Sequence, residues 1–130
     1  MTDQRYSRAL RRHLVAEPHA LRAARQEIVD TLELHGPVRA RVALLVSELV
    51  SNAVLHGSGD AIELSADLDD GRVRVEVYDD GGGFEPPPPP REGEPVPAGW
   101  GLYLVSRLAD RWGVDGGRRT RVWFEIDHHG

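Results

Sequence analysis

The sequence contains neither cysteine nor lysine, and all 16 of its basic side chains are arginine. Without cysteine there are no disulfides, no thiolate metal ligands and no thiol nucleophile. Without lysine there is no P-loop lysine, no Schiff-base chemistry and no lysine of the protein-kinase type. A nucleoside triphosphate, if one binds, must therefore be held by backbone amides, a helix N-terminus, arginine or a metal ion.

Long apolar runs are also missing, because charged residues interrupt each apolar stretch well before the ~18 residues that a membrane span requires. No basic and then apolar leader opens the chain. The net charge of −5 argues against the basic face that nonspecific nucleic-acid binding needs. With 130 residues, 40% of them hydrophobic and 28% charged, the chain suits one globular core. We expect a soluble cytoplasmic protein with no direct nucleic-acid partner and no membrane partner.

The first half of the chain is predicted to hold one strand and two helices. Residues 1–17 form a polar tail with a first strand at Ala9–Val15, and residues 18–130 form a single domain. Helical spacing after Pro18 predicts a helix that Gly36 caps at its C-terminus. Pro37 begins a second helix that Gly57 closes. The apolar positions that predict these helices are Leu21, Ala24, Ile28 and Leu32 in the first, and Val42, Leu45, Val46, Leu49, Val50 and Ala53 in the second.

In the second half, alternating apolar residues predict strands at Ile62–Leu68 and Val73–Tyr78, with a hairpin turn at Asp69–Gly71. A Gly/Pro-rich segment follows and extends to Pro97. A helix that contains Leu102, Leu104, Val105 and Leu108 and a strand at Arg119–Ile126, with room for one further strand, complete the order. This order predicts an α/β two-layer sandwich, a largely antiparallel sheet with helices on one face.

Three polar residues on the second helix are candidate site residues. Glu48, Asn52 and His56 are four apart, so they form one stripe beside the apolar residues that face the sheet. A carboxylate can act as a base, and an amide oxygen is a hard ligand suited to Mg²⁺. Taken alone, such a stripe is more typical of a solvated helix face.

Two glycine segments add to this stripe. Asp79 precedes Gly81 and Gly83 at the end of a predicted strand, where a carboxylate can accept the exocyclic amine of adenine and glycines let a flat base approach. Gly99 and Gly101 open the last helix before Leu102, where free backbone amides and the helix dipole suit phosphate. Each segment alone is also typical of an ordinary turn or helix boundary.

In this order, the three motifs resemble the N, G1 and G2 boxes of the GHKL superfamily, which includes the ATP-binding domains of sensor histidine kinases and DNA gyrase. The segments Ser47–Val54, Gly99–Val105 and Val122–Phe124 resemble the histidine-kinase-like ATPase family of anti-sigma factors typified by RsbW. The resemblance extends from about Pro18 to Ile126. It implies the Bergerat-type ATP-binding fold.

The resemblance also implies a role for each matched residue. Glu48 corresponds to the catalytic base and Asn52 to the ligand of a Mg²⁺ that bridges the phosphates. His56 corresponds to a position near the triphosphate, and Asp79, with Gly81 and Gly83, to the adenine pocket. Gly99, Gly101 and the Leu102 amide correspond to the phosphate-binding segment, and residues 84–98 to the lid over the nucleotide. ATP and Mg²⁺ are the implied cofactors.

By this resemblance, the protein is an anti-sigma factor that binds a sigma factor and phosphorylates a serine of a STAS-type antagonist. Relatives are commonly homodimers. Two alternatives stay open: an ATP-binding regulator without kinase activity, and the output module of a larger phosphatase-type regulator. The short lid with Pro86–Pro90, and Trp100 where many relatives have a polar residue, depart from the family pattern. The segment before Pro18 is too short for a phosphoacceptor helix pair, so we do not expect an autophosphorylating histidine kinase.

Overall fold

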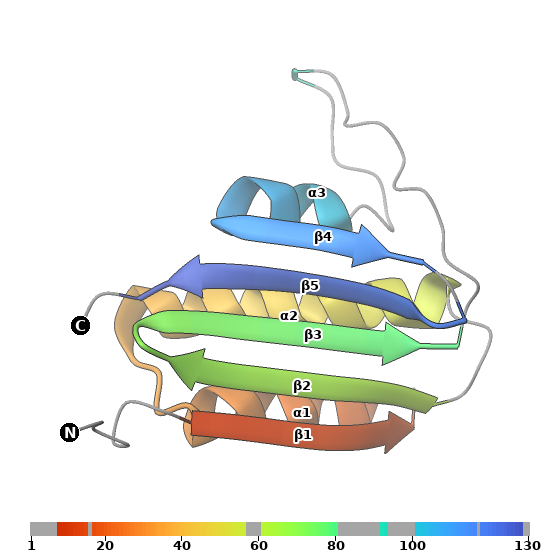
Figure 1. The fold of residues 1–130 in the computed structure, drawn as a ribbon, viewed down its shortest axis with the longest axis horizontal. Coiled ribbons are helices and arrows are strands. Elements are labelled where there is room, and N and C mark those ends of the chain that lie inside the picture. The colour runs from red at the N-terminus through yellow and green to blue at the C-terminus, as the bar shows by residue number, and fades with distance from the viewer. Residues whose placement is uncertain are drawn as a thin grey trace.

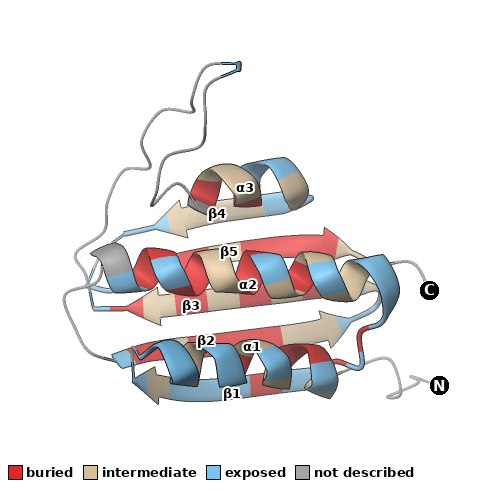
Figure 2. Ribbon diagram, turned by 180° about the vertical axis from the view of Figure 1, so that it is seen from behind, coloured by how far each residue is buried: buried red, intermediate tan, exposed pale blue. Residues whose placement is uncertain are grey.

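The computed structural model describes residues 8–15, 17–56, 61–80, 92–93, 101–116 and 118–128. Five strands form one antiparallel sheet in the order β1-β2-β3-β5-β4, and three helices lie on one of its faces (Figure 1, Figure 2). The predicted two-layer sandwich is therefore confirmed. The elements are β1 (Arg8–Val15), α1 (Pro18–Thr31), α2 (Gly36–His56), β2 (Ala61–Asp69), β3 (Arg72–Asp79), α3 (Gly101–Leu108), β4 (Arg111–Asp115) and β5 (Thr120–Asp127).

The core lies between the helices and the sheet, and α2 is at its centre. Leu45 and Leu49 are fully buried on the face of α2 that packs against β3 and β5, as the helical spacing predicted. Val75 and Phe124 meet them from the sheet and are also fully buried. Among the helices that the structure describes, none combines the length and the apolar character that a bilayer crossing demands.

The prediction that Gly36 caps the first helix is wrong. The helix ends at Thr31, and Glu33 takes the left-handed conformation with φ of 55°. The reason is Leu34, which is fully buried and donates its backbone N–H to the carbonyl of Val29. To bury Leu34, the chain must leave the helix before Gly36, and Gly36 instead begins α2. The predicted stop at Gly57 lies outside the described residues.

The strand predictions are confirmed for β1, β2, β3 and β5, each within two residues at either end. In the hairpin, Asp69 pairs with Arg72, and the two turn residues Asp70 and Gly71 have φ of 52° and 75°. Positive φ at both positions is typical of a type I′ turn. The strand β4 had no predicted range. The predicted loop, including residues 84–98, lies outside the described residues except for Glu92 and Gly93.

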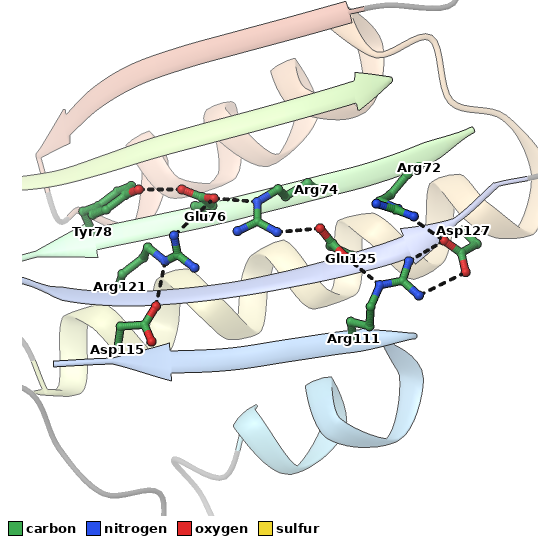
Figure 3. A network of polar contacts seen from close by, with 9 residues as sticks. All are labelled: Arg72, Arg74, Glu76, Tyr78, Arg111, Asp115, Arg121, Glu125 and Asp127. Carbon is green, nitrogen blue, oxygen red and sulfur yellow. Dashed lines mark hydrogen bonds and ion pairs between the residues drawn. The ribbon is translucent and has the colours of Figure 1, made fainter. Parts of the chain in front are cut away.

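The face of the sheet opposite the helices carries a network of arginines and carboxylates (Figure 3). Glu125, at its centre, is 8% exposed and accepts hydrogen bonds from Arg74 and Arg111. Burial acts to raise the pKa of Glu125, but the hydrogen bonds from these two arginines outweigh it and hold the pKa below its usual value. On this face of the sheet, the charged side chains of β3, β4 and β5 thus pair with one another.

Trp123 lies on the same face, flanked by two guanidinium groups and seated over a glycine. The guanidinium carbons of Arg74 and Arg121 are 4.6 and 5.7 Å from the centre of its ring. A Cβ at Gly113, directly opposite in register, would lie 2.8 Å from the indole Nε1. The ring can therefore occupy this position only while residue 113 has no side chain.

We expect Gly113→Ala to reduce the free energy of unfolding by about 1–3 kcal/mol, because the added methyl group must displace the indole ring. Chemical denaturation measures this change. In a Trp123→Ala background the same substitution should cost much less, and this double-mutant cycle isolates the contact. An equal cost in both backgrounds would show that the ring contact does not set the requirement for glycine.

Candidate functional site

The candidate site residues come from three elements that meet at one end of the molecule. In Figure 1, the C-terminal end of α2, the end of β3 and the start of α3 all lie on the right-hand side. α2 packs against both β3 and α3. The structure thus brings the helix stripe, the strand-end aspartate and the first turn of the last helix to the same region, although they are far apart in the sequence.

Asn52 is buried, with 3% of its surface exposed. Its Nδ2 atom has no hydrogen-bond partner among the described residues. A buried polar atom without a partner costs about 1–3 kcal/mol, so native structures rarely keep one without a reason. The interpretation of the stripe as a solvated helix face therefore does not fit Asn52. The burial and the unpaired amide fit a group that a ligand completes.

Glu48 lies one turn before Asn52 on α2 and is partly buried. Burial raises the pKa of its carboxyl group above the usual value, because a charged form is less stable away from water. A raised pKa moves a carboxylate toward the range in which it can accept a proton near neutral pH. The third member of the stripe, His56, is the last residue of α2, and its side chain lies outside the described part of the structure.

Asp79 is the last residue of β3, and only 4% of its surface is exposed. Its side chain is on the helix side of the sheet, because it follows the buried positions Val75 and Val77 in the strand alternation. The two glycines that follow it in the sequence motif, Gly81 and Gly83, lie outside the described residues. The aspartate is therefore at a strand end and faces the layer that contains α2.

Thr120 is a site residue that the sequence motifs did not single out. It is directly opposite Asp79 in the β3–β5 register and is 2% exposed. The alternation of β5 contained the signal, since Val122, Phe124 and Ile126 were predicted to share one face and Thr120 continues that series. With this hydroxyl and the carboxylate of Asp79 both buried, the interior at this end of the sheet contains two polar side chains.

The start of α3 supplies the third part of the site. Gly101 is its first residue, and Leu102 is 5% exposed. The first N–H groups of a helix have no acceptor within the helix, and the helix dipole favours an anion there. Gly99, the first glycine of this motif, lies outside the described residues. The described part of the motif can donate backbone hydrogen bonds to phosphate oxygens.

The donor set suits a nucleotide with a metal ion. A buried carboxylate at Asp79 can accept hydrogen bonds from an amine, and the amide group of Asn52 can supply an oxygen to a hard cation such as Mg²⁺. Such an ion would complete its shell with phosphate oxygens and water. The unpaired atom of Asn52 is the donor Nδ2, from which an oxygen of a bound nucleotide could accept a hydrogen bond, and this observation supports a nucleotide at the site.

Comparison with known proteins agrees with this arrangement. A family model described as a histidine kinase-like ATPase domain matches residues 14–126. No curated protein matches the chain. The structure containing the RsbU and RsbW domains of Rv1364c from Mycobacterium tuberculosis is similar with a TM-score of 0.70, at 24% identity over 92% of this chain and 32% of that one. This chain therefore spans about a third of its length.

Two histidine kinases have a similar fold. The histidine kinase domain of the blue-light activated kinase from Erythrobacter litoralis EL346 gives a TM-score of 0.52 at 24% identity, over 85% of this chain and 60% of that one. The kinase AdeS of Acinetobacter baumannii gives 0.55 at 15% identity, over 93% and 68%. Because the family model covers most of the sequence and the fold agrees over nearly its whole length, the chain belongs to the histidine kinase-like ATPase domain family.

Proposed function

We propose that the protein is an ATP-dependent regulator of the anti-sigma type, with serine kinase activity toward a STAS-type antagonist. The observation that supports this most directly is the buried, unpaired amide of Asn52, one turn from Glu48 on a helix packed against β3. The motifs of the GHKL superfamily on the same residues support ATP as the ligand. The RsbW-like segments support the anti-sigma assignment.

Asp79 would recognise the adenine base. Its carboxylate would accept a hydrogen bond from the exocyclic amine of adenine, whereas guanine presents a carbonyl at the same position and would repel it. Burial strengthens this discrimination, because little water reaches a carboxylate that is 4% exposed to offset its repulsion by the guanine carbonyl. Gly81 and Gly83 would shape the pocket around the base.

Asn52 would hold the Mg²⁺ of the nucleotide, and the amides of Gly101 and Leu102, together with Gly99, would hold its phosphates. When bound, Mg²⁺ offsets negative charge on the phosphates, and ATP supplies the phosphoryl group. His56 would lie near the triphosphate, and residues 84–98 would cover it. These residues position the reacting group without a lysine.

Glu48 would act as the general base. The proton of a serine hydroxyl on the antagonist passes to its carboxylate as the serine oxygen bonds to the γ-phosphorus, and the bond from that phosphorus to ADP breaks. Burial raises the pKa of Glu48 and so makes this carboxylate a stronger proton acceptor. The position one turn from Asn52 brings the base and the metal ligand to one side of the helix.

A sigma factor and the STAS-type antagonist are the proposed protein partners, and a homodimer is the proposed assembly. The alternative is an ATP-binding regulator without kinase activity, which the proline-rich segment Pro86–Pro90 favours. Glu48 and Asn52 favour the kinase, since a pure binding module has no need of a base beside the metal ligand.

Asp79→Asn tests the adenine assignment. We expect ATP binding to weaken by about 1–3 kcal/mol, the value of a lost charge-assisted hydrogen bond. We also expect the preference of the wild type for ATP over GTP to shrink, because an amide can donate to the guanine carbonyl. Isothermal titration calorimetry with both nucleotides and Mg²⁺ measures both effects. Equal affinity of the wild type for ATP and GTP would contradict the role of Asp79.

Glu48→Gln separates the kinase from the binding module. We expect ATP affinity to persist while phosphoryl transfer to the antagonist falls on the order of 10²–10⁴-fold, because glutamine keeps the shape but removes the basic oxygen. Asn52→Ala, the matched variant one turn away, should instead weaken Mg²⁺-dependent ATP binding. Radiolabelled ATP with the cognate antagonist measures transfer. No transfer by the wild type would favour the binding-only alternative, and full transfer by Glu48→Gln would exclude the base.

The same variant has a pH signature in the free protein. Because burial raises the pKa of Glu48 in the folded state, its carboxylate reduces the free energy of unfolding as pH rises above the ordinary value of 4.5. Glu48→Gln should therefore be more stable than the wild type at pH 7.5, with the difference vanishing toward pH 4. Denaturant unfolding at several pH values measures this difference.

Glu76→Gln is the control of opposite sign. Burial acts to raise the pKa of Glu76, but hydrogen bonds from Tyr78 and Arg74 outweigh it and lower the pKa. The stabilisation from Glu76 is thus present above its usual pKa and is lost as pH falls through the lowered value. Glu76→Gln should be less stable than the wild type at pH 7.5. The same pH trend in both variants would contradict the assignment for Glu48.

A further inference from the structure

A groove runs between α1 and α2 on the side of the helix layer away from the sheet. Its volume is about 410 Å³. Four of its lining residues come from each helix: Pro18, Leu21, Arg22 and Arg25 from α1, and Ser47, Val50, Ser51 and Val54 from α2. Half of these residues are apolar, and none is acidic.

The apolar part of the groove continues onto an uncharged stripe of α2. Ala40, Leu44, Ser47, Ser51 and Val54 are three or four residues apart, so they share one face of the helix. Leu44 is 42% exposed and Val54 is 45% exposed. Only one other large apolar side chain of the described residues, Val15, is as exposed as these two. Leu44 and Val54 are thus two of the three exposed large apolar residues, and both lie on the same face of α2.

The charged part of the groove consists of Arg22 and Arg25. Within the described residues, neither has a carboxylate within ion-pair distance. Arg25 donates instead to the hydroxyl of Ser47, with 3.0 Å between Nη1 and Oγ. The acidic residue before the groove, Glu17, contacts His19. Both guanidinium groups can therefore donate hydrogen bonds to the carboxylates of a partner.

Other arginines nearby behave differently. Arg12 pairs with Glu27 of α1 at 2.7 Å, and Arg39 pairs with Asp30 at 2.8 Å. In a chain of net charge −5, carboxylates are in excess, yet none is placed in this groove. The groove thus combines an apolar lining, in which Val54 is 45% exposed, with a local positive charge that no described carboxylate neutralises.

We propose that this groove is the docking site for an acidic, partly apolar segment of a partner protein. Carboxylates of the segment bind the guanidinium groups of Arg22 and Arg25, which favour carboxylates because of their planar pairs of donors. An aliphatic side chain of the segment packs against Leu21, Val50 and Val54. Ser47 holds the guanidinium of Arg25 in place before the partner arrives, which reduces the ordering cost of binding.

The groove adjoins the proposed nucleotide site through α2. Ser51 lines the groove, and the next residue, Asn52, is about 100° further around the helix and is buried. The proposed function gives this groove its role, which would be to hold the regulated protein, and the proposal rests on the proposed function in that respect alone. The binding itself needs no nucleotide, so the two proposals can fail separately.

Selection of peptides from a random 12-residue phage library tests the chemistry of the partner. The wild-type protein is the bait, and Arg22→Gln/Arg25→Gln is the counter-selection. We expect enriched sequences to combine Asp or Glu with Leu, Ile or Val. No enrichment, enrichment of sequences without acidic residues, or equal enrichment on the double variant would each overturn the proposal.

An enriched peptide, labelled with fluorescein, then gives dissociation constants by fluorescence anisotropy. We expect Arg25→Gln and Arg22→Gln each to weaken binding about 10-fold, the value of one charge-assisted hydrogen bond. Val54→Ser should weaken it by a similar factor, and a rise in salt from 50 to 500 mM should also weaken it. Matched controls are Arg11→Gln and Val15→Ser, on the opposite face of the sheet, which should bind like the wild type.

Two further measurements separate the outcomes. ATP binding measured by calorimetry should be the same for Arg25→Gln and the wild type, so that weaker peptide binding by the variant reports on the groove and not on the fold. Equal peptide binding by Arg25→Gln and the wild type counts against the groove, whereas a wild type that does not bind ATP counts against the proposed function. Sedimentation analysis tests a second copy of the chain as the occupant. A dimer that Arg25→Gln dissociates would overturn the proposal of an acidic partner segment.

Discussion

The helix α2, which lies over the centre of the sheet between α1 and α3, determines most of the structure (Figure 2). One face of this helix supplies the centre of the core through Leu45 and Leu49, and an adjoining face carries Glu48 and Asn52. Core and site therefore share the same helical turns. A shift of α2 large enough to move the polar side chains would also open the packing against β3 and β5, which interiors resist because they are close-packed. The packing of Leu45 and Leu49 against the sheet thus fixes the positions of Glu48 and Asn52 on the adjoining face of α2.

The site needs this rigidity because its polar groups are buried. Asn52 and Asp79 are on different elements, and each is at most 4% exposed. In such surroundings electrostatic interactions are stronger than in water, but a misplaced partner costs correspondingly more. The fold meets this requirement by placing one residue at the end of a central strand and the other on the central helix.

The sequence predicted those parts of the structure that depend on local periodicity. The spacing of Leu45 and Leu49 predicted the buried face of α2, and Asp70 and Gly71 predicted the hairpin turn. It did not predict the end of α1, because burial of Leu34 is a tertiary effect and places Glu33, rather than a glycine, in the left-handed conformation.

Two other features could not be read from local pattern alone. The strand β4 has five residues, too few for a clear alternation, and Gly113 within it is understandable only once Trp123 lies opposite. The burial of Asn52, which distinguishes a site from a solvated helix face, and the contact of Thr120 with the same layer depend on how α2 and β5 pack. The motifs indicated Glu48, Asn52 and Asp79, and the packing shows how they are placed together.

The two edge strands of the sheet affect how the protein associates with other molecules. Among the described strands, β1 and β4 each have one neighbour, so the backbone groups on their outer sides could pair with a strand of another molecule. β1 carries Arg8, Arg11, Arg12 and His13 within eight residues, and β4 has Arg111 and Asp115 at its ends. Repulsion between the like charges of two β1 strands opposes the pairing of these edges, which is a step toward fibril growth. The positive charge of β1 thus opposes polymerisation of the protein through that edge of its open sheet.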